Sequence, residues 1–243
     1  FAQAMHDLIP NSLRRRWTDG RIERKKFSCS TFMMYLGLRG RYDDLTHHTI
    51  HIAEDYEGNL NAIERDFKIP DTPSFYVQNA SVTDPTLAPE GCSGLYVLVP
   101  VPHMHANVEW TEETKQALRR KTFEQLARIG LHDVESRIMT ERVLTPKNWT
   151  EDFGLFRGAT FNLAHSLDQM LHLRPHNRFE DLQDVYLVGG GTHPGSGLPV
   201  IYEPSRITCR QLLTRFVCDT RFIGSPLPFP ASNVTHQASL AAA

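Results

Sequence analysis

The feature of the sequence that most constrains the fold is a short apolar run that leads directly into clustered glycines, DVYLVGGGTHPGSGLP at residues 184–199. The apolar run at residues 185–188 has the length and β-branched character of a buried strand. Leu198 and Pro199 close the stretch, and proline is favoured at the first position of a helix. Glycines let a backbone approach a ligand closely, and a helix start directs free N–H groups and a positive dipole at negative charge. The stretch therefore predicts a strand, a glycine-rich turn and a helix start that together bind a cofactor.

The order of the glycines excludes the two commonest nucleotide-binding motifs. A Rossmann opening has G-x-G-x-x-G at its first strand with an acidic residue about twenty positions later, and a P-loop has G-x-x-x-x-G-K-[ST]. Neither pattern is present in this sequence. The glycine cluster thus indicates another way of holding a flat or charged ligand, or a glycine-rich turn that holds no ligand at all.

Composition is that of a folded protein. The 243 residues suffice for one large domain or two modest ones, and a hydrophobic fraction of 40% can supply a core. The 26 basic and 28 acidic residues give a net charge of -2 at pH 7, so we expect no nucleic-acid partner. The cysteines are widely spread without a C-x-x-C pair, which argues against a zinc ribbon or a disulfide scaffold and predicts reduced thiols in the cytoplasm. They are Cys29, Cys92, Cys209 and Cys218.

No run of about 20 apolar residues is present, and the first residues do not follow a signal-peptide pattern. The chain starts at Phe1, without an initiator methionine, inside what reads as a helix, and we therefore expect a fragment of a longer protein. Peripheral contact with a membrane stays open. The basic residues from Arg14 to Lys26 are interpreted either as solvated charges or as a surface that faces anionic lipid.

Periodicity predicts an α/β chain in which helices flank a mixed sheet. Apolar and β-branched runs predict strands at residues 27–38, 47–53, 75–79, 95–101 and 138–144. Helical spacing predicts helices at residues 2–16, 56–69, 111–130 and, after the glycines, 198–215. Pro100 is interpreted as a strand end or an edge position, and Pro204 as a bend or a late start of the last helix.

Two pairs of histidines are candidate metal ligands. His47 and His51 fall on one face of a predicted strand, and His103 and His105 lie in a loop at a strand end. No cysteine completes a ligand set beside either pair, so we interpret both pairs as ordinary polar residues and predict no metal site. Arg174 has two interpretations, as a structural residue or as a residue near a substrate cavity.

Four segments together resemble the C-terminal half of the bacterial-type carotenoid desaturases, the phytoene desaturase family. The most specific is THPGSGLP at residues 192–199, directly after YLVGGG, which is similar to the flavin motif with which that family returns to its dinucleotide domain. SVTDPTLAPEG at residues 81–91, followed by LYVLVPVPH, resembles its substrate-domain signature. ERVLTP at residues 141–146 and the stretch at residues 153–176 resemble the segments that lead from the substrate domain to the flavin strand.

The resemblance implies an FAD-dependent oxidoreductase of carotenoid biosynthesis that removes hydrogens from a long polyene such as phytoene by hydride transfer to the flavin. Backbone N–H groups and the helix start are expected to stabilise the reduced ring, and an apolar tunnel to hold the polyene. No residue is singled out as catalytic, although His193 is a candidate proton acceptor with a packing role as the alternative. The expected FAD-binding residues are Gly190, Gly191, Thr192, His193, Pro194, Gly195, Ser196, Gly197, Leu198 and Pro199.

The same resemblance implies an α+β substrate domain joined to a segment of a Rossmann-like FAD domain. Residues 1–145 are expected to form part of the substrate domain, and residues 146–218 to return to the FAD domain with the flavin loop at 189–199. Residues 219–243 are expected to be a disordered tail. The strand with G-x-G-x-x-G that holds the FAD pyrophosphate is missing here, so the expected partner is the N-terminal half of the same enzyme, and the chain alone should bind FAD poorly. The family also implies peripheral membrane contact.

Two alternatives remain open. One is a related FAD-dependent carotenoid or retinoid oxidoreductase, such as a neurosporene-type dehydrogenase, a diapocarotenoid oxidase or a retinol saturase-like enzyme. The other is a non-catalytic carrier of an apolar ligand, built from the substrate domain alone. Such a carrier has no use for a glycine loop at a strand end, which favours the enzyme.

Overall fold

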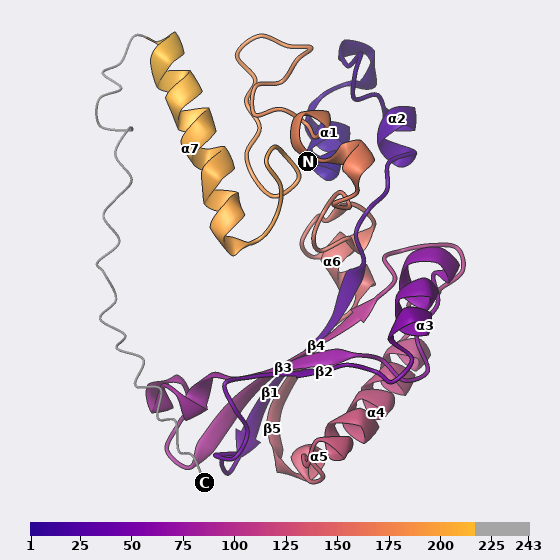
Figure 1. Ribbon diagram of the computed structural model, residues 1–243, viewed down its shortest axis with the longest axis vertical. Coiled ribbons are helices and arrows are strands. Elements are labelled where there is room, and N and C mark those ends of the chain that lie inside the picture. Colours follow the sequence, from indigo (N-terminus) through magenta and orange to yellow (C-terminus); the bar gives the residue numbers. More distant parts are fainter. Residues whose placement is uncertain (217–243) are drawn as a thin grey trace, which may run out of the picture.

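Five strands of the described chain form one antiparallel sheet, in the spatial order β2-β3-β4-β1-β5 (Figure 1). The computed structural model describes residues 1–216. The strands are β1 (Ser30–Arg39), β2 (His48–His51), β3 (Phe75–Asn79), β4 (Cys92–Val101) and β5 (Ile138–Leu144). The five apolar runs that predicted this sheet are confirmed as strands, although the sheet is not mixed as expected.

Each strand pair of the sheet is antiparallel, and the strand predicted at residues 185–188 does not join it. That prediction is wrong: the segment is extended but forms only an isolated bridge between Tyr186 and Arg178. A strand of a sheet is held by a ladder of several backbone hydrogen bonds to its neighbour. Within residues 1–216, only residues 177–179 exchange backbone hydrogen bonds with this segment. The Rossmann-like FAD domain therefore stays an expectation.

Alternation along the strands decides which face of the sheet is the core, since neighbouring side chains of a strand point to opposite faces. The buried positions of β1, β3 and β4 share one face, and α4 (Glu112–Arg128) packs against it through Leu118 and Leu126 (Figure 1). The strand residues of this core are Phe32, Met34, Leu36, Leu38, Phe75, Val77, Leu95, Val97, Val99 and Val101.

The helix α4 forms where its capping signals predict it. The Thr111 side chain accepts the N–H of Thr114 at 3.2 Å, which satisfies one of the free donors of the first turn. Gly130 follows the last turn with a positive φ of 90° that a side chain would disfavour. Arg119 donates to Glu141 of β5 at 2.7 Å, so helix and sheet are tied by an ion pair as well as by the core.

The face of the sheet opposite α4 carries tyrosines. Tyr96 lies between Tyr35 and Tyr76, with ring centroids 5.4 and 5.9 Å apart in edge-on arrangements. Leu98 pairs with Tyr76 across β4 and β3 and so shares this face. We call Tyr35, Tyr76, Tyr96 and Leu98 the tyrosine face. Gln78 and Arg142 pair with Tyr96 and Tyr35 and so lie on the same side of the sheet, beside these aromatic and aliphatic residues. This side of the sheet is the one on which α7 lies (Figure 1).

A second hydrophobic cluster joins the two ends of the described chain. It unites α1 (Ala2–Leu8) and α2 (Asp19–Glu23) with the long loops that follow the sheet. Residues 1–27 therefore share a core with residues 156–187 rather than with the sheet. The buried members of this cluster are Ala2, Met5, Ile9, Trp17, Ile22, Phe27, Ala159, Leu163 and Phe179.

The first predicted helix is shorter than expected. Instead of spanning residues 2–16, α1 ends at Leu8, and a single 3-10 turn at Asn11–Leu13 follows. Pro10 separates the two because a proline has no N–H to continue the helical ladder.

Arg14 corrects the interpretation of the basic cluster as wholly solvated. It is buried, and it donates to the carbonyl of Trp17 at 2.9 Å and to the carboxylate of Asp19 at 2.6 Å. Arg14 is therefore part of the folded structure around Trp17 and Asp19. Arg16 is also paired, with Glu180 at 3.0 Å.

The helix predicted at residues 56–69 is also shorter. α3 (Tyr56–Asn61) widens into a π-helical turn at Ala62–Asp66 and ends at Phe67, which adopts a left-handed φ of 52°. Leu60, which helical spacing places on the same face as Ile63, is 39% exposed, whereas Ile63 is buried. The π turn adds residues per turn and so changes which side chains face the core, an effect that regular helical spacing does not anticipate.

The last helix, α7 (Leu198–Arg215), has the predicted bounds and runs through Pro204, so the late-start interpretation is wrong. β4 likewise continues through Pro100 to Val101. Pairing with β3 ends at Leu98, so the missing N–H of Pro100 costs no bond to that strand.

The remaining α-helices are α5 (Val134–Arg137) and α6 (Pro146–Glu151). Short 3-10 turns lie at Ala80–Val82, Pro85–Leu87, Phe156–Gly158, Leu167–Gln169 and Leu171–Leu173. Of the helices in the described part, none is both long and apolar enough to cross a bilayer. The tail predicted at residues 219–243 lies outside the described residues.

Candidate functional site

The glycine loop, residues 189–197, leads into α7 and has a buried half and an exposed half. Gly191, Thr192 and Gly195 are buried, whereas Gly197 and the first turn of the helix are exposed. Leu198 in that turn is 73% exposed. The ten residues predicted to bind FAD therefore lie together, but only part of them is open to a ligand.

Hydrogen bonds hold the buried half of the loop. The Thr192 hydroxyl donates to the carbonyl of Gly189 at 2.8 Å, and the Asn177 amide donates to the Thr192 hydroxyl at 3.3 Å. The backbone N–H of His193 donates to the carbonyl of Pro175 at 2.8 Å. These bonds join the loop to the segment before it, so the loop is a folded structure and not a flexible connector.

Two glycines are required by packing inside the loop. A Cβ at Gly191 would lie 2.6 Å from Asn162 Oδ1 and 2.6 Å from Phe1 Cβ, and a Cβ at Gly190 would lie 2.9 Å from Ser196 Cβ. Such distances are shorter than carbon contacts allow. These glycines are thus explained by close approach of the chain to itself, before any ligand is considered.

Gly197 differs because it leaves open space. As the N-cap residue of α7 it has a φ of 115°, and a Cβ there would meet only Val200 Cγ2 at 3.9 Å. The backbone N–H groups of Gly197, Leu198 and Val200 have no acceptor within residues 1–216. Free donors at the start of a long helix suit a ligand with negative charge, so this end of the loop fits the anionic edge of a flavin.

His165 supports the exposed half. The N–H of Ser196 donates to Nε2 of His165 at 3.2 Å, and the Ser196 hydroxyl lies 3.2 Å from the same nitrogen. Nε2 must be unprotonated to accept that N–H. Burial, and then the charge of Arg174, lowers the pKa of His165 and favours this neutral form. His165 is not among the residues predicted for the site, because it lies 31 residues from Ser196 and carries no local signal of this contact.

Arg174 lies behind the loop and is 0% exposed. Its Nη2 donates to the carbonyls of Gly190 at 3.0 Å and Leu163 at 3.1 Å, and its Nη1 donates to Ala164 at 3.3 Å. These contacts support the structural interpretation of Arg174, with the loop as one of its partners.

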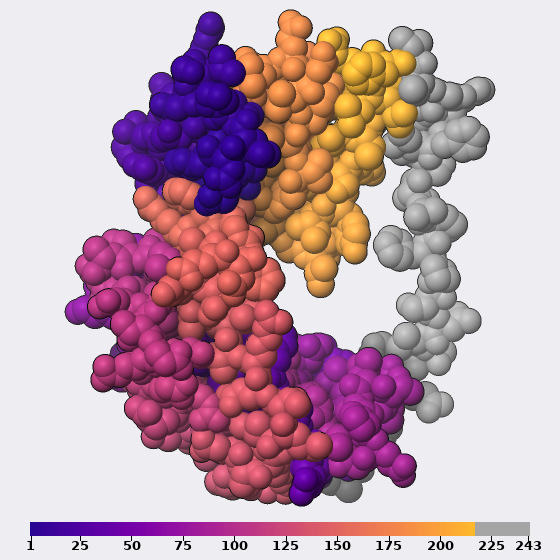
Figure 2. Space-filling model, turned by 180° about the vertical axis from the view of Figure 1, so that it is seen from behind, coloured from indigo at the N-terminus to yellow at the C-terminus, as the bar shows by residue number. Residues whose placement is uncertain are grey.

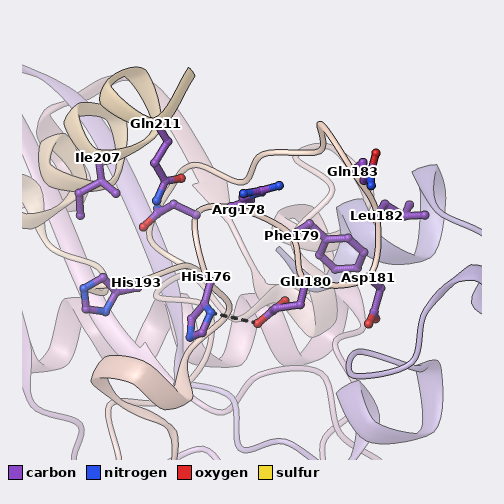
Figure 3. A pocket seen from close by; sticks show the side chains of 11 residues that line it. His176, Arg178, Phe179, Glu180, Asp181, Leu182, Gln183, His193, Ile207 and Gln211 are labelled. Atoms are coloured by element: carbon purple, nitrogen blue, oxygen red, sulfur yellow. Dashed lines mark ion pairs between the residues drawn. The ribbon is translucent and has the colours of Figure 1, made fainter. Parts of the chain in front are cut away.

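A cavity of about 720 Å³ lies between residues 176–183 and α7 (Figure 3). His176 and Glu180 form an ion pair there at 3.4 Å. His193 lines the same cavity, and its Nδ1 lies 3.0 Å from the carbonyl of Leu171, so Nδ1 carries the proton. This bond is what a packing role requires, and a role of His193 as proton acceptor stays a prediction.

One histidine of each candidate metal-binding pair contacts a neighbouring side chain. His47 Nδ1 lies 2.8 Å from the Thr83 hydroxyl, and the His105 ring stacks on Phe67 with centroids 3.9 Å apart. In the part of the chain that the structure describes, no three side chains of the metal-binding types gather into a possible ion site.

Comparison with known proteins finds carotenoid desaturases among the relatives of this chain. The chain is 48% identical over 213 residues to a 4,4'-diapophytoene desaturase (4,4'-diapolycopene-forming) of Methylomonas sp, covering 87% of this chain and 41% of the relative. It is 45% identical over 215 residues to an all-trans-zeta-carotene desaturase of Myxococcus xanthus, covering 87% and 40%. It is 36% identical over 193 residues to a lycopene-forming phytoene desaturase of Pseudescherichia vulneris, covering 79% and 39%.

The matches cover a larger fraction of this chain than of its relatives. The chain spans about 40% of the length of the curated relatives that it matches, while most of its own length is covered. No protein-family profile matches the chain.

Proposed function

The chain belongs to the bacterial-type carotenoid desaturases, and from that premise we propose that it supplies the polyene-binding and flavin-facing parts of an FAD-dependent desaturase. The whole enzyme removes hydrogens from a long polyene in carotenoid biosynthesis. The relatives named above are desaturases of diapophytoene, zeta-carotene and phytoene, which supports a polyene as the substrate class.

The observation that carries this proposal is that two suitable surfaces face one space. The N-terminal end of α7, with the exposed half of the glycine loop, points toward the sheet (Figure 1). Figure 2 shows the molecule hollowed between α7 and the sheet. The tyrosine face lies on that side of the sheet. An uncharged polyene needs an apolar wall, and a flavin needs free donors near its anionic edge, so both requirements meet here.

FAD, when bound, supplies the hydride acceptor. The part of this chain is to present N–H groups from Gly197, Leu198 and Val200, with the positive end of α7 behind them. Thr192 and His193 hold the loop in place from the buried side. Donors that are fixed before the reaction need no reorganisation when negative charge develops, which is the main way in which such a site lowers a barrier.

We propose the N-terminal half of the same enzyme as partner. The extended segment at residues 185–188 pairs along one edge only, and Val188 is 55% exposed. An unpaired edge beside an open cavity suits the addition of strands from another part of the protein. The expected domain division at residue 145 stays a proposal, and the second hydrophobic cluster favours adding residues 1–27 to the FAD-side unit.

Peripheral membrane contact is the third part of the proposal, and a basic groove supports it. Five cations and one carboxylate, that of Asp168, line the groove, and Leu173 forms part of the same wall. The cations are Arg16, Arg21, Arg24, Lys25 and Lys26. Nearby, Leu167 is 91% exposed. Cations beside exposed leucines suit an anionic lipid surface. Co-sedimentation with phosphatidylglycerol vesicles should be lost when three of these cations are replaced by glutamate, while binding that persists unchanged in that variant rejects this surface.

The function is tested by pigment analysis. The reading frame that contains this chain is expressed in a host that accumulates phytoene, and the expected result is a more conjugated, coloured carotenoid together with stoichiometric FAD in the purified protein. Conversion of a different polyene identifies the related-oxidoreductase alternative. Binding of the polyene without FAD and without conversion supports the carrier and rejects the desaturase.

A further inference from the structure

Arg174 is a buried cation without a counter-ion. It is 0% exposed, and none of the ion pairs within the described residues includes it. Moving a charge from water into a protein costs several kcal/mol unless its partners compensate. Burial accordingly lowers the pKa of Arg174, although a guanidinium stays charged at neutral pH. If the side chain at position 174 only had to fill space, an uncharged residue there would make the folded protein more stable.

The contacts of Arg174 show what the charge is placed against. Its two terminal nitrogens reach carbonyls in two separate segments, Leu163 and Ala164 on one side and Gly190 on the other. The planar fork of a guanidinium spans such a set, which the single nitrogen of a lysine cannot do in the same geometry. Arg174 therefore joins the segment before the loop to the loop itself.

The remaining donor of Arg174 has no partner. Its Nε is buried and makes no hydrogen bond. It would lie 3.9 Å from a Cβ at Gly195, two residues before the N-cap of α7. The titratable group that faces it from the neighbouring segment is His165, whose pKa is lowered by burial and then by the charge of Arg174, which favours the neutral imidazole. The positive charge of Arg174 thus stands directly behind the glycine loop and adds to the positive end of α7.

We propose that Arg174 is a positioning residue that holds the glycine loop in register and keeps a permanent positive charge behind it, so that the site favours the reduced, anionic flavin over the oxidised one. This inference rests on the proposed function for its flavin part. Its bracing part concerns this chain alone. A buried charge that is otherwise costly is explained if it stabilises negative charge on the far side of the loop.

The bracing part is tested in this chain, without flavin, by amide hydrogen exchange. In Arg174→Met, exchange at residues 189–197 should be at least tenfold faster, because the bond to the Gly190 carbonyl is lost. Arg178→Met is the matched control: Arg178 lies four residues away and lines a surface cavity, and its replacement should leave exchange in the loop unchanged. Equal exchange in wild type and both variants overturns the brace.

The electrostatic part is tested in the flavin-loaded holoenzyme by redox titration. Arg174→Met should lose about tenfold in its preference for reduced over oxidised flavin, which lowers the two-electron midpoint potential by about 30 mV. Arg174→Lys keeps the charge without the fork, so it should retain a near wild-type potential while the loop exchanges faster. A Met variant with unchanged potential overturns this part.

The two parts can fail separately from the proposed function. If the wild-type holoenzyme holds no flavin, the proposed function fails, and hydrogen exchange alone decides the brace. If Arg174→Met does not fold, Arg174→Lys decides the brace: faster exchange in the loop supports it, and unchanged exchange overturns it. Arg174→Gln then replaces Arg174→Met in the redox titration, with the same expected fall in potential, and an unchanged potential overturns the electrostatic part.

Discussion

Gly191 and Gly197 have different roles in the loop, and the atoms that a Cβ would meet at each position show the difference. Gly191 sits against Asn162 and Phe1, where no further carbon fits. Gly197 faces open space at the N-cap of α7. The first is therefore a requirement of folding, and the second leaves room for a ligand.

Replacing Gly191 by alanine should destabilise the fold. The new Cβ must displace Asn162 and Phe1, and overpacking of this kind costs about 1–3 kcal/mol. Urea unfolding measures the change. Gly94→Ala is the control, since a Cβ there meets nothing within 4 Å and should change the free energy of unfolding by less than about 0.5 kcal/mol. A Gly191→Ala variant as stable as wild type would contradict the packing explanation.

His165 should make stability fall in acid. Its pKa is lowered in the folded state, so the unfolded chain takes up the proton first, near the ordinary value of about 6.5. The contribution of neutral His165 to the free energy of unfolding is complete above that pH. It is lost as the pH falls through the lowered pKa of the folded state. Burial lowers the pKa of His103 as well, which adds in the same direction.

The measurement for this effect is urea unfolding at pH 7.5 and pH 5. Wild type should be less stable at the lower pH, and His165→Gln should show a smaller difference between the two. Equal pH dependence in wild type and variant would mean that His165 does not contribute to the loss of stability in acid.

At the scale of elements, α4 and α7 are both long helices, but they bury different side chains against the rest of the protein. α4 buries Leu118 and Leu126 against the sheet, while α7 buries only Pro204 and Thr208 among its described residues. Most helical stability in proteins comes from packing of an apolar face. We infer that the sheet with α4 is the more stable part, and that α7 depends more on what covers it.

Truncation of Leu126 to alanine should therefore be costly. The side chain is fully buried between α4 and the sheet, and such a change costs about 2–5 kcal/mol by lost burial and cavity formation. Leu87→Ala is the control, because Leu87 is exposed and its loss should stay within about 0.5 kcal/mol. Thermal unfolding of both variants is the measurement. A small effect at Leu126 would contradict the assignment of the core face.

At the scale of the whole molecule, the proposed activity depends on two separate parts of the fold. The tyrosine face belongs to the sheet, and the glycine loop belongs to the second unit, whose core includes the first 27 residues. A charge on the tyrosine face should harm polyene binding without disturbing the loop.

Leu98→Glu in the flavin-loaded enzyme tests that separation. A carboxylate on an apolar wall must be desolvated by the polyene, so KM for the polyene should rise by tenfold or more while FAD content stays at wild type. Leu87→Glu, on an exposed turn, is the matched control and should leave both values unchanged. Loss of FAD together with polyene turnover in the Leu98 variant would show that the two surfaces are not separable.

Local sequence determined the elements whose signals are local. Apolar and β-branched runs located β1, β3 and β4, and Thr111 with Gly130 bounded α4, because strand propensity and capping depend on neighbours in the chain. THPGSGLP located the loop and the start of α7 in the same way.

Tertiary structure alone decided what depends on distant partners. Residues 185–188 are as apolar as any strand here, yet they lack a neighbour along one edge and stay outside the sheet. Arg174 and His165 look unremarkable in sequence and meet the glycine loop only because the chain folds back on itself. Pairing and burial are properties of contacts between segments, and a segment read by itself does not contain its partner.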